Sequence, residues 1–139
     1  MHATRAPLRA TALALSVSAF GFGALVGLTA VPAVASGGGD DVRTHGACSG
    51  TTDWKMKAKS DDGKVEVEAE IDSNKVGQTW SWKLKDNGTL VSAGTSQTKA
   101  PSGSFSVERK PADKAGTDSF LFRAVNPSSG EVCRATISW

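Results

Sequence analysis

The chain has 139 residues, of which 39% are hydrophobic and 22% are charged, and its formal net charge is +2 at pH 7. This length holds one small domain and a leader, and it leaves no room for a second domain. Arg5 and Arg9 lie in an apolar N-terminal segment, so the rest of the chain has fourteen basic and fourteen acidic residues. That neutral balance gives no support to nucleic-acid binding or to anionic-membrane binding, since both need a basic patch.

Residues 1–35 have the organisation of an export signal. Arg5 and Arg9 form a positive region, residues 10–31 are almost wholly apolar, and residues 33–35 read Ala-Val-Ala, the small-x-small pattern that signal peptidase cleaves after. We therefore expect a secreted, extracellular protein that begins at Ser36. Because the apolar run is longer than a usual signal core, an uncleaved signal that anchors the protein in a membrane stays open as the alternative.

The segment after the signal is rich in glycine, and we expect residues 36–47 to form a flexible leader before a folded domain at residues 48–139. Cys48 and Cys133 are the only cysteines, and thiols outside the cytoplasm are normally oxidised. They predict one disulfide that joins the two ends of the domain. The alternative, a metal site built on His45 and Cys48, lacks further ligands nearby, so no metal and no cofactor is expected.

The clearest β-hairpin pattern surrounds Asp62-Gly63. Lysines alternate with apolar residues over residues 54–60, and glutamates alternate with apolar residues over residues 64–71. A two-residue turn at Asp62-Gly63 places the lysines opposite the glutamates, for example Lys57 against Glu68. The hairpin is therefore predicted to have a lysine–glutamate ladder on one face and an apolar row on the other.

A second hairpin is expected at Asn87-Gly88, the strongest short hairpin signal in the chain. A two-residue turn there predicts three cross-strand pairs, which are Leu84 with Val91, Trp82 with Ala93, and Trp80 with Thr95.

Three further strands are expected around residues 105–107, 120–124 and 133–139, with loops at residues 98–103 and 126–130 between them. The chain then has seven strands with turn signals at short intervals and no stretch with helical spacing. This pattern predicts an all-β fold, a seven-stranded antiparallel two-sheet sandwich.

Two segments resemble the immunoglobulin-type domain. Residues 63–71, which read Gly-x-Val-x-Val-x-Ala-x-Ile, resemble the family's strand B. Trp80 and Trp82 follow at the interval of its buried strand C tryptophan. Residues 118–124, which read Asp-x-x-x-Phe-x-Ala, resemble its strand F motif.

The chain departs from that family at the residues that usually stabilise it. Ala69 and Ala124 stand where the family has its two core cysteines, and Phe122 stands in place of the corner tyrosine. The resemblance therefore implies an immunoglobulin-like sandwich without the B–F disulfide, and it implies no function. The whole chain is also similar to small secreted actinobacterial proteins of uncharacterised role.

The chain has four tryptophans and no tyrosine, and two of the tryptophans lie close together. Trp80 and Trp82 are a candidate ligand platform, because an exposed indole can stack on a sugar or anchor a partner protein. The alternative is core packing, since both indoles fall on the apolar parity of their strand.

No catalytic constellation is visible. After the signal the chain has one histidine, His45, which lies in the leader without a neighbouring nucleophile. Glu66, Glu68 and Glu70 alternate opposite lysines, which is typical of a solvated ladder and not of a carboxylate pair in a cleft.

We therefore expect an exported, non-enzymatic binding or interaction module that acts at or outside the cell envelope. Its partner is expected to be a protein or an envelope glycan, and not a nucleic acid. The alternative is a secreted inhibitor of a hydrolase that uses an exposed loop, either residues 98–103 or residues 126–130.

Overall fold

The computed structural model describes residues 41–139, so the predicted signal peptide at residues 1–35 and the first part of the predicted leader lie outside the described residues. The described part forms eight strands: β1 (Asp41–Ala47), β2 (Asp53–Asp61), β3 (Lys64–Asp72), β4 (Thr79–Asp86), β5 (Thr89–Gln97), β6 (Ser104–Arg109), β7 (Ser119–Val125) and β8 (Val132–Ser138). None of residues 41–139 belongs to a helix that could cross a membrane.

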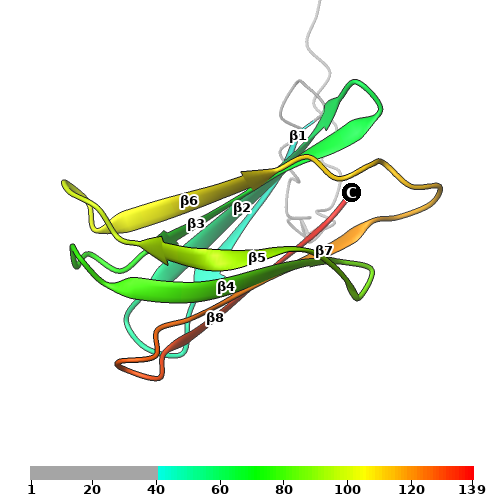
Figure 1. Ribbon diagram of the computed structural model, residues 1–139. Coiled ribbons are helices and arrows are strands. Elements are labelled where there is room, and N and C mark those ends of the chain that lie inside the picture. The colour runs from blue at the N-terminus through cyan, green and yellow to red at the C-terminus, as the bar shows by residue number, and fades with distance from the viewer. Residues whose placement is uncertain (1–40) are drawn as a thin grey trace, which may run out of the picture. The chain divides into compact units, whose positions relative to one another are not determined.

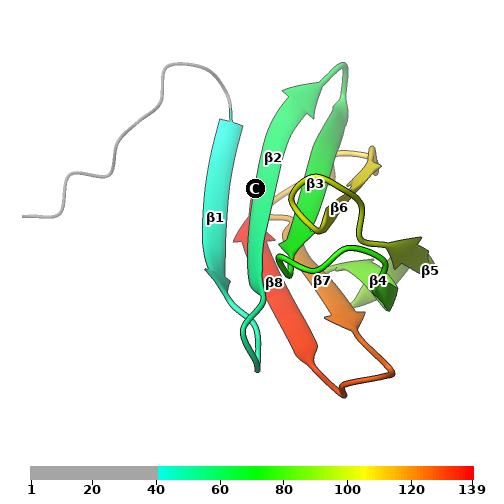
Figure 2. The ribbon, with the colours of Figure 1, turned by 90° about the vertical axis from the view of Figure 1, so that its left-hand side faces the viewer.

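The strands form two antiparallel sheets of four strands each, which pack face to face (Figures 1 and 2). The first sheet has the order β1-β2-β3-β6, and the second has the order β5-β4-β7-β8. The predicted all-β sandwich is therefore confirmed. It contains one strand more than expected, because β1 joins the first sheet.

The flexible leader was predicted for residues 36–47, and strand β1 corrects this prediction for residues 41–47, the part of the leader that the structure describes. Asp41–Ala47 pairs along its whole length with β2, and Thr44 lies opposite Met56. The Thr44 hydroxyl also donates a hydrogen bond of 2.8 Å to the carbonyl oxygen of Thr136 in the second sheet. The glycine-rich composition before Asp41 concealed this strand, which is held by the unpaired backbone groups at the edge of β2.

The first hairpin has the predicted register. Asp62 and Gly63 have φ angles of 47° and 75°, as a two-residue turn of type I′ requires. The lysine–glutamate ladder lies on the outer face, with nitrogen–oxygen distances of 3.1 Å, 3.0 Å and 3.0 Å for the pairs Lys55–Glu70, Lys57–Glu68 and Lys59–Glu66. The apolar row faces the core.

The second hairpin turns at Asn87-Gly88 as predicted, but its register differs. A β-bulge on β5 shifts the pairing by one residue beyond the turn, so the three predicted pairs are wrong. The observed partners of Leu84, Trp82 and Trp80 are Ser92, Gly94 and Ser96.

The packing of Trp82 explains the bulge. A Cβ atom at Gly94 would lie 2.8 Å from Cζ2 of Trp82, closer than packed carbon atoms approach. Glycine is therefore needed opposite this indole, and the register with Ala93 in that place would produce a clash. The bulge resolves the conflict by leaving Val91 as the extra residue, half-buried against the core.

The core is formed by the inward rows of both sheets. Its largest buried side chains are Trp80, Phe120, Phe122, Met56, Ile71 and Leu84. Cys133 is also fully buried, and it forms the predicted disulfide with Cys48, with the two Cα atoms 4.3 Å apart.

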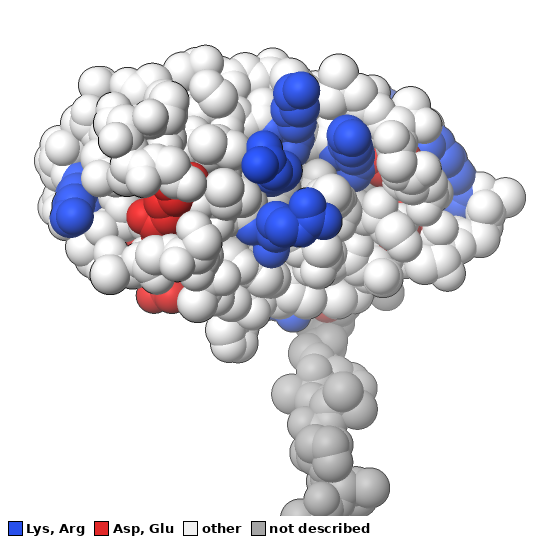
Figure 3. Space-filling view, turned by 90° about the horizontal axis from the view of Figure 1, so that it is seen from below, with Lys and Arg blue, Asp and Glu red and all other residues white. Residues whose placement is uncertain are grey.

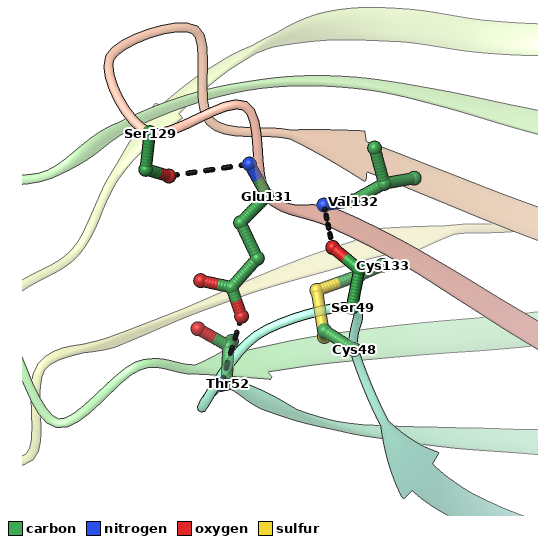
Figure 4. Close-up of a disulfide and its surroundings, with 7 residues drawn as sticks. All are labelled: Cys48, Ser49, Thr52, Ser129, Glu131, Val132 and Cys133. Atoms are coloured by element: carbon green, nitrogen blue, oxygen red, sulfur yellow. Dashed lines mark hydrogen bonds between the residues drawn. A yellow bond between two sulfur atoms is a disulfide. The ribbon is translucent and has the colours of Figure 1, made fainter.

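The disulfide fastens the segment after β1 to the start of β8 (Figure 4). Backbone and side-chain hydrogen bonds reinforce the same junction. The amide of Thr52 donates to the Glu131 carboxylate at 2.8 Å, and the amide of Val132 donates to the Ser49 hydroxyl at 2.9 Å. The leading segment and the last strand are thus joined covalently and by hydrogen bonds.

Candidate functional site

The predicted aromatic platform does not lie on the surface. Trp80 has no exposed surface and Trp82 is 5% exposed. The indole nitrogen of Trp82 donates to the Ser96 hydroxyl at 3.0 Å, its ring stacks on Phe122 with centroids 5.7 Å apart, and the Arg109 guanidinium lies 5.1 Å from the ring centroid. Both indoles therefore belong to the core, and neither offers a free face to a ligand.

The outer face of the first sheet carries charges that neutralise one another. Lys59 and Lys110 both contact Glu66, at 3.0 Å and 3.2 Å, and hydrogen bonding from Lys59 holds the pKa of the Glu66 carboxyl below its usual range. Lys110 also contacts Asp61 at 2.8 Å and lowers the pKa of that carboxyl. A ligand at this face must displace existing ion pairs.

The outer face of the second sheet differs, because its charges have one sign. Four cationic residues lie there on three neighbouring strands, and we call them the basic face: Lys83, Lys85, Arg123 and Arg134. Figure 3 shows lysine and arginine side chains gathered over the middle of this side of the molecule, with acidic side chains lying apart from them.

The pairing of the strands places like charges directly opposite one another. Lys83 lies across from Arg123 on β7, and Arg123 lies across from Arg134 on β8. Within residues 41–139, none of the four side chains of the basic face forms an ion pair or a side-chain hydrogen bond. Like charges directly opposite one another destabilise a sheet, so we expect this row to lower the stability of the fold.

Two adjoining hollows lie on the basic face. One has a volume of about 240 Å³ and is lined by Leu121 together with all four cations. The other has a volume of about 200 Å³, and Lys83 and Arg123 belong to both. The outer side of the second sheet therefore has a charged depression that extends over more than one strand.

The second hollow is lined mainly by small and apolar residues: Ser81, Ala93, Gly94 and Val125, with Trp82 beneath them. Leu90 and Leu121 both lie opposite Lys85, which therefore separates them. The two leucines do not form a continuous apolar patch.

A larger hollow, of about 290 Å³, lies over the ladder of the first sheet. Its charged lining includes the ion pairs Lys55–Glu70 and Lys57–Glu68. We consider the basic face the better site despite its smaller hollows, since its cations are not neutralised and can attract an anion without breaking an existing pair.

The residues considered for chemistry have other partners. His45 lies on the outer face of β1, opposite Lys55, and Cys48 is in the disulfide, which removes it as a metal ligand. Glu68 and Glu70 are paired with lysines. Residues 41–139 contain no group of three or more His, Cys, Asp or Glu side chains arranged to hold a metal ion.

Comparison with known proteins does not assign the chain to a family. No protein-family model, no curated protein and no solved structure matches it.

Sequence reasoning missed the basic face because it considered total charge. The four cations are separated along the chain, and the fourteen acidic residues that follow residue 35 offset them in the sum. The sequence did contain a pattern that indicates this face. The outward positions of β4, β7 and β8 hold only neutral or basic residues, because Asp86, the one acidic residue in these three strands, is buried. This pattern predicts a basic face only when the three strands are known to be neighbours in one sheet.

Proposed function

We propose that this protein is an exported, non-enzymatic binding module whose basic face binds an anionic ligand at or outside the cell envelope. One observation carries the proposal, namely the unneutralised row of Lys83, Arg123 and Arg134 across three neighbouring strands. Functional sites often carry arrangements that cost stability, and a row of like charges without counter-charges is such an arrangement. A negative charge bound beside these cations adds attractive interactions that offset the repulsion within the row.

Two further features support the export and non-enzymatic parts of the proposal. The disulfide is typical of proteins that fold in an oxidising compartment. The glutamates that would be candidates for acid–base chemistry are held in ion pairs with lysines on the outer face of the first sheet, away from the two hollows of the basic face. We retain the immunoglobulin-like resemblance as part of the proposal, supported by the buried Trp80 and by the two antiparallel sheets.

The alternative of a hydrolase inhibitor receives less support from the loops that would insert into an active site. Residues 126–130 form a tight turn in which the Asn126 side chain accepts a hydrogen bond of 2.9 Å from the Ser128 amide. Residues 127–130, which follow Asn126, are Pro, Ser, Ser and Gly, and they present no large side chain. In the loop at residues 98–103, Thr98 and Gly103 are buried and only residues 99–102 are exposed, so a short segment is presented to solvent.

The proposal is tested by retention of the purified, oxidised protein on immobilised dextran sulfate, with uncharged dextran as the blank. The double variant Lys83→Gln, Arg123→Gln removes the two cations that both hollows share. The matched control is Lys55→Gln, Lys57→Gln, which removes the same charge from the opposite face.

We expect the wild type and the control to elute at similar salt concentrations, and the Lys83→Gln, Arg123→Gln variant to elute at a clearly lower one. The reason is that a local row of cations, and not the total charge, governs retention. Equal losses in both double variants would refute the proposal, as would a wild type that is not retained.

A further inference from the structure

The geometry of the basic face indicates an extended ligand. Lys83, Arg123 and Arg134 form a row perpendicular to the strands, and neighbouring strands lie about 4.8 Å apart, so the backbone positions in the row span about 10 Å. Lys85 lies two residues along β4 from Lys83, which adds a fourth charge about 7 Å to one side. A compact anion would contact only part of this row.

The positions of the two hollows indicate the direction in which an extended ligand would cross the second sheet. The first hollow includes Arg134 of β8, and the second reaches Ala93 and Gly94 of β5. Lys83 and Arg123 lie between, because they line both. A chain that fills both hollows must cross the strands from β8 to β5, with its charges over the cations and an uncharged part over the small residues of β5.

The absence of an aromatic surface here narrows the class of polymer. Proteins that bind single-stranded nucleic acids stack the bases on aromatic side chains. The only aromatic residue that lines either hollow is Trp82, which is 5% exposed and lies behind Gly94. Recognition at this face must therefore come from charge and from contact with small side chains, without the stacking on which single-stranded nucleic-acid binding depends and without the indole contact that a sugar could otherwise use.

We infer that the ligand is a linear acidic polysaccharide that crosses the second sheet over the row of Lys83, Arg123 and Arg134. This inference rests on the proposed function. A linear polymer of acidic sugars carries a negative group on every unit, so several of its carboxylates can lie over the row at once. The hollow lined by Ala93, Gly94 and Val125 accommodates a further sugar ring without stacking.

The inference is tested by titrating the oxidised protein with galacturonate oligomers of defined length: a dimer, a tetramer and an octamer. The tetramer should bind at least about tenfold more tightly than the dimer because it spans all three cations of the row and reaches the second hollow, and the octamer should improve on the tetramer by only about threefold. The tetramer's affinity should fall with salt on a logarithmic slope of about two, at roughly 0.7 per neutralised charge for the three cations of the row.

A pair of variants tests whether the chain reaches the second hollow. Ser81→Asp adds a negative charge to its lining, and Ser106→Asp adds the same charge to an exposed position on the outer face of the first sheet. Ser81→Asp should weaken tetramer binding several-fold more than dimer binding. Ser106→Asp should change neither by more than about twofold.

Several results would overturn the inference. They are equal affinity for dimer and tetramer, equal effects of the two aspartate variants, or tighter binding of a thymidine oligonucleotide than of a galacturonate oligomer of equal charge. Polyphosphate of equal charge is the remaining comparison, and tighter binding of polyphosphate would also overturn it. Retention on dextran sulfate separates failure of this inference from failure of the proposed function. If the protein is not retained, the proposed anion-binding function fails as well. If it is retained, only the inferred class of polymer is wrong.

Discussion

Replacing Arg123 by glutamine should stabilise the protein at low salt, although it removes a residue of the proposed site. Arg123 is the middle member of the row, with Lys83 on one side and Arg134 on the other. Glutamine keeps a long polar side chain and removes both repulsive cross-strand contacts. The loss of binding and the gain of stability therefore have the same physical cause.

The magnitude follows from the number of like-charge contacts. Cross-strand pairs contribute roughly 0.2–1 kcal/mol each, so relief of two repulsive pairs should raise the free energy of unfolding by about 1 kcal/mol. For a domain of about 100 residues this corresponds to an increase in Tm of roughly 4–8 °C. The effect should be largest near 0.01 M salt, where the Debye length is about 30 Å, and should almost vanish at 1 M, where it is about 3 Å.

Thermal unfolding followed by circular dichroism at both salt concentrations measures this effect. Lys55→Gln is the control, because Lys55 lies 3.1 Å from Glu70 and hydrogen bonding to that carboxylate raises the pKa of the lysine. That variant loses a favourable pair, so its Tm should fall slightly at low salt. A lower Tm for Arg123→Gln at both salt concentrations would refute the reasoning, since it would show that packing of the arginine stem outweighs the repulsion.

Three further predictions concern the fold. Replacing both Cys48 and Cys133 by serine should lower the free energy of unfolding by about 4.5 kcal/mol, the chain-entropy value for a sequence separation of 85, and an unchanged urea midpoint would contradict this. Gly94→Ala should cost roughly 1–3 kcal/mol and shift the emission of Trp82, because the added Cβ would lie 2.8 Å from the indole; a neutral substitution would show that the bulge has another cause. Because Lys59 and Lys110 lower the pKa of Glu66 in the folded state, the stabilisation from this residue is present above about pH 4.5 and is lost as the pH falls through the lowered pKa. Acid titration of Glu66→Gln should therefore show a shallower loss of stability than the wild type below about pH 4.5, and parallel curves would exclude this residue as a source of acid sensitivity.

Local patterns in the sequence were sufficient for the first hairpin and for the disulfide. The alternation of lysines and glutamates with apolar residues, together with the turn at Asp62-Gly63, permits one register, because a slip by one residue would expose the apolar row. The disulfide followed from two cysteines in a chain with a predicted export signal. In both cases the residue types identify the partners: lysines pair with glutamates, and the two cysteines pair with each other.

Tertiary packing decided the features that local patterns left open. The register of β5 depends on the Trp82 indole, which needs Gly94 opposite it, and this contact does not appear in a turn signal. Strand β1 depends on its pairing with the edge of β2, a contact that the composition of residues 36–47 does not reveal. The burial of Trp80 and Trp82 was one of two alternatives, and the packing of the two sheets selected it.

The basic face likewise depends on tertiary structure and not on composition. Lys83, Arg123 and Arg134 are distant in sequence, and in a chain with balanced charge none of them is unusual. They become a site because the second sheet places β4, β7 and β8 side by side, with all three residues directed to the same outer face. Composition reports only the sum of the charges, whereas the electric field that attracts a ligand depends on their separation in space, which is set by the pairing of the strands.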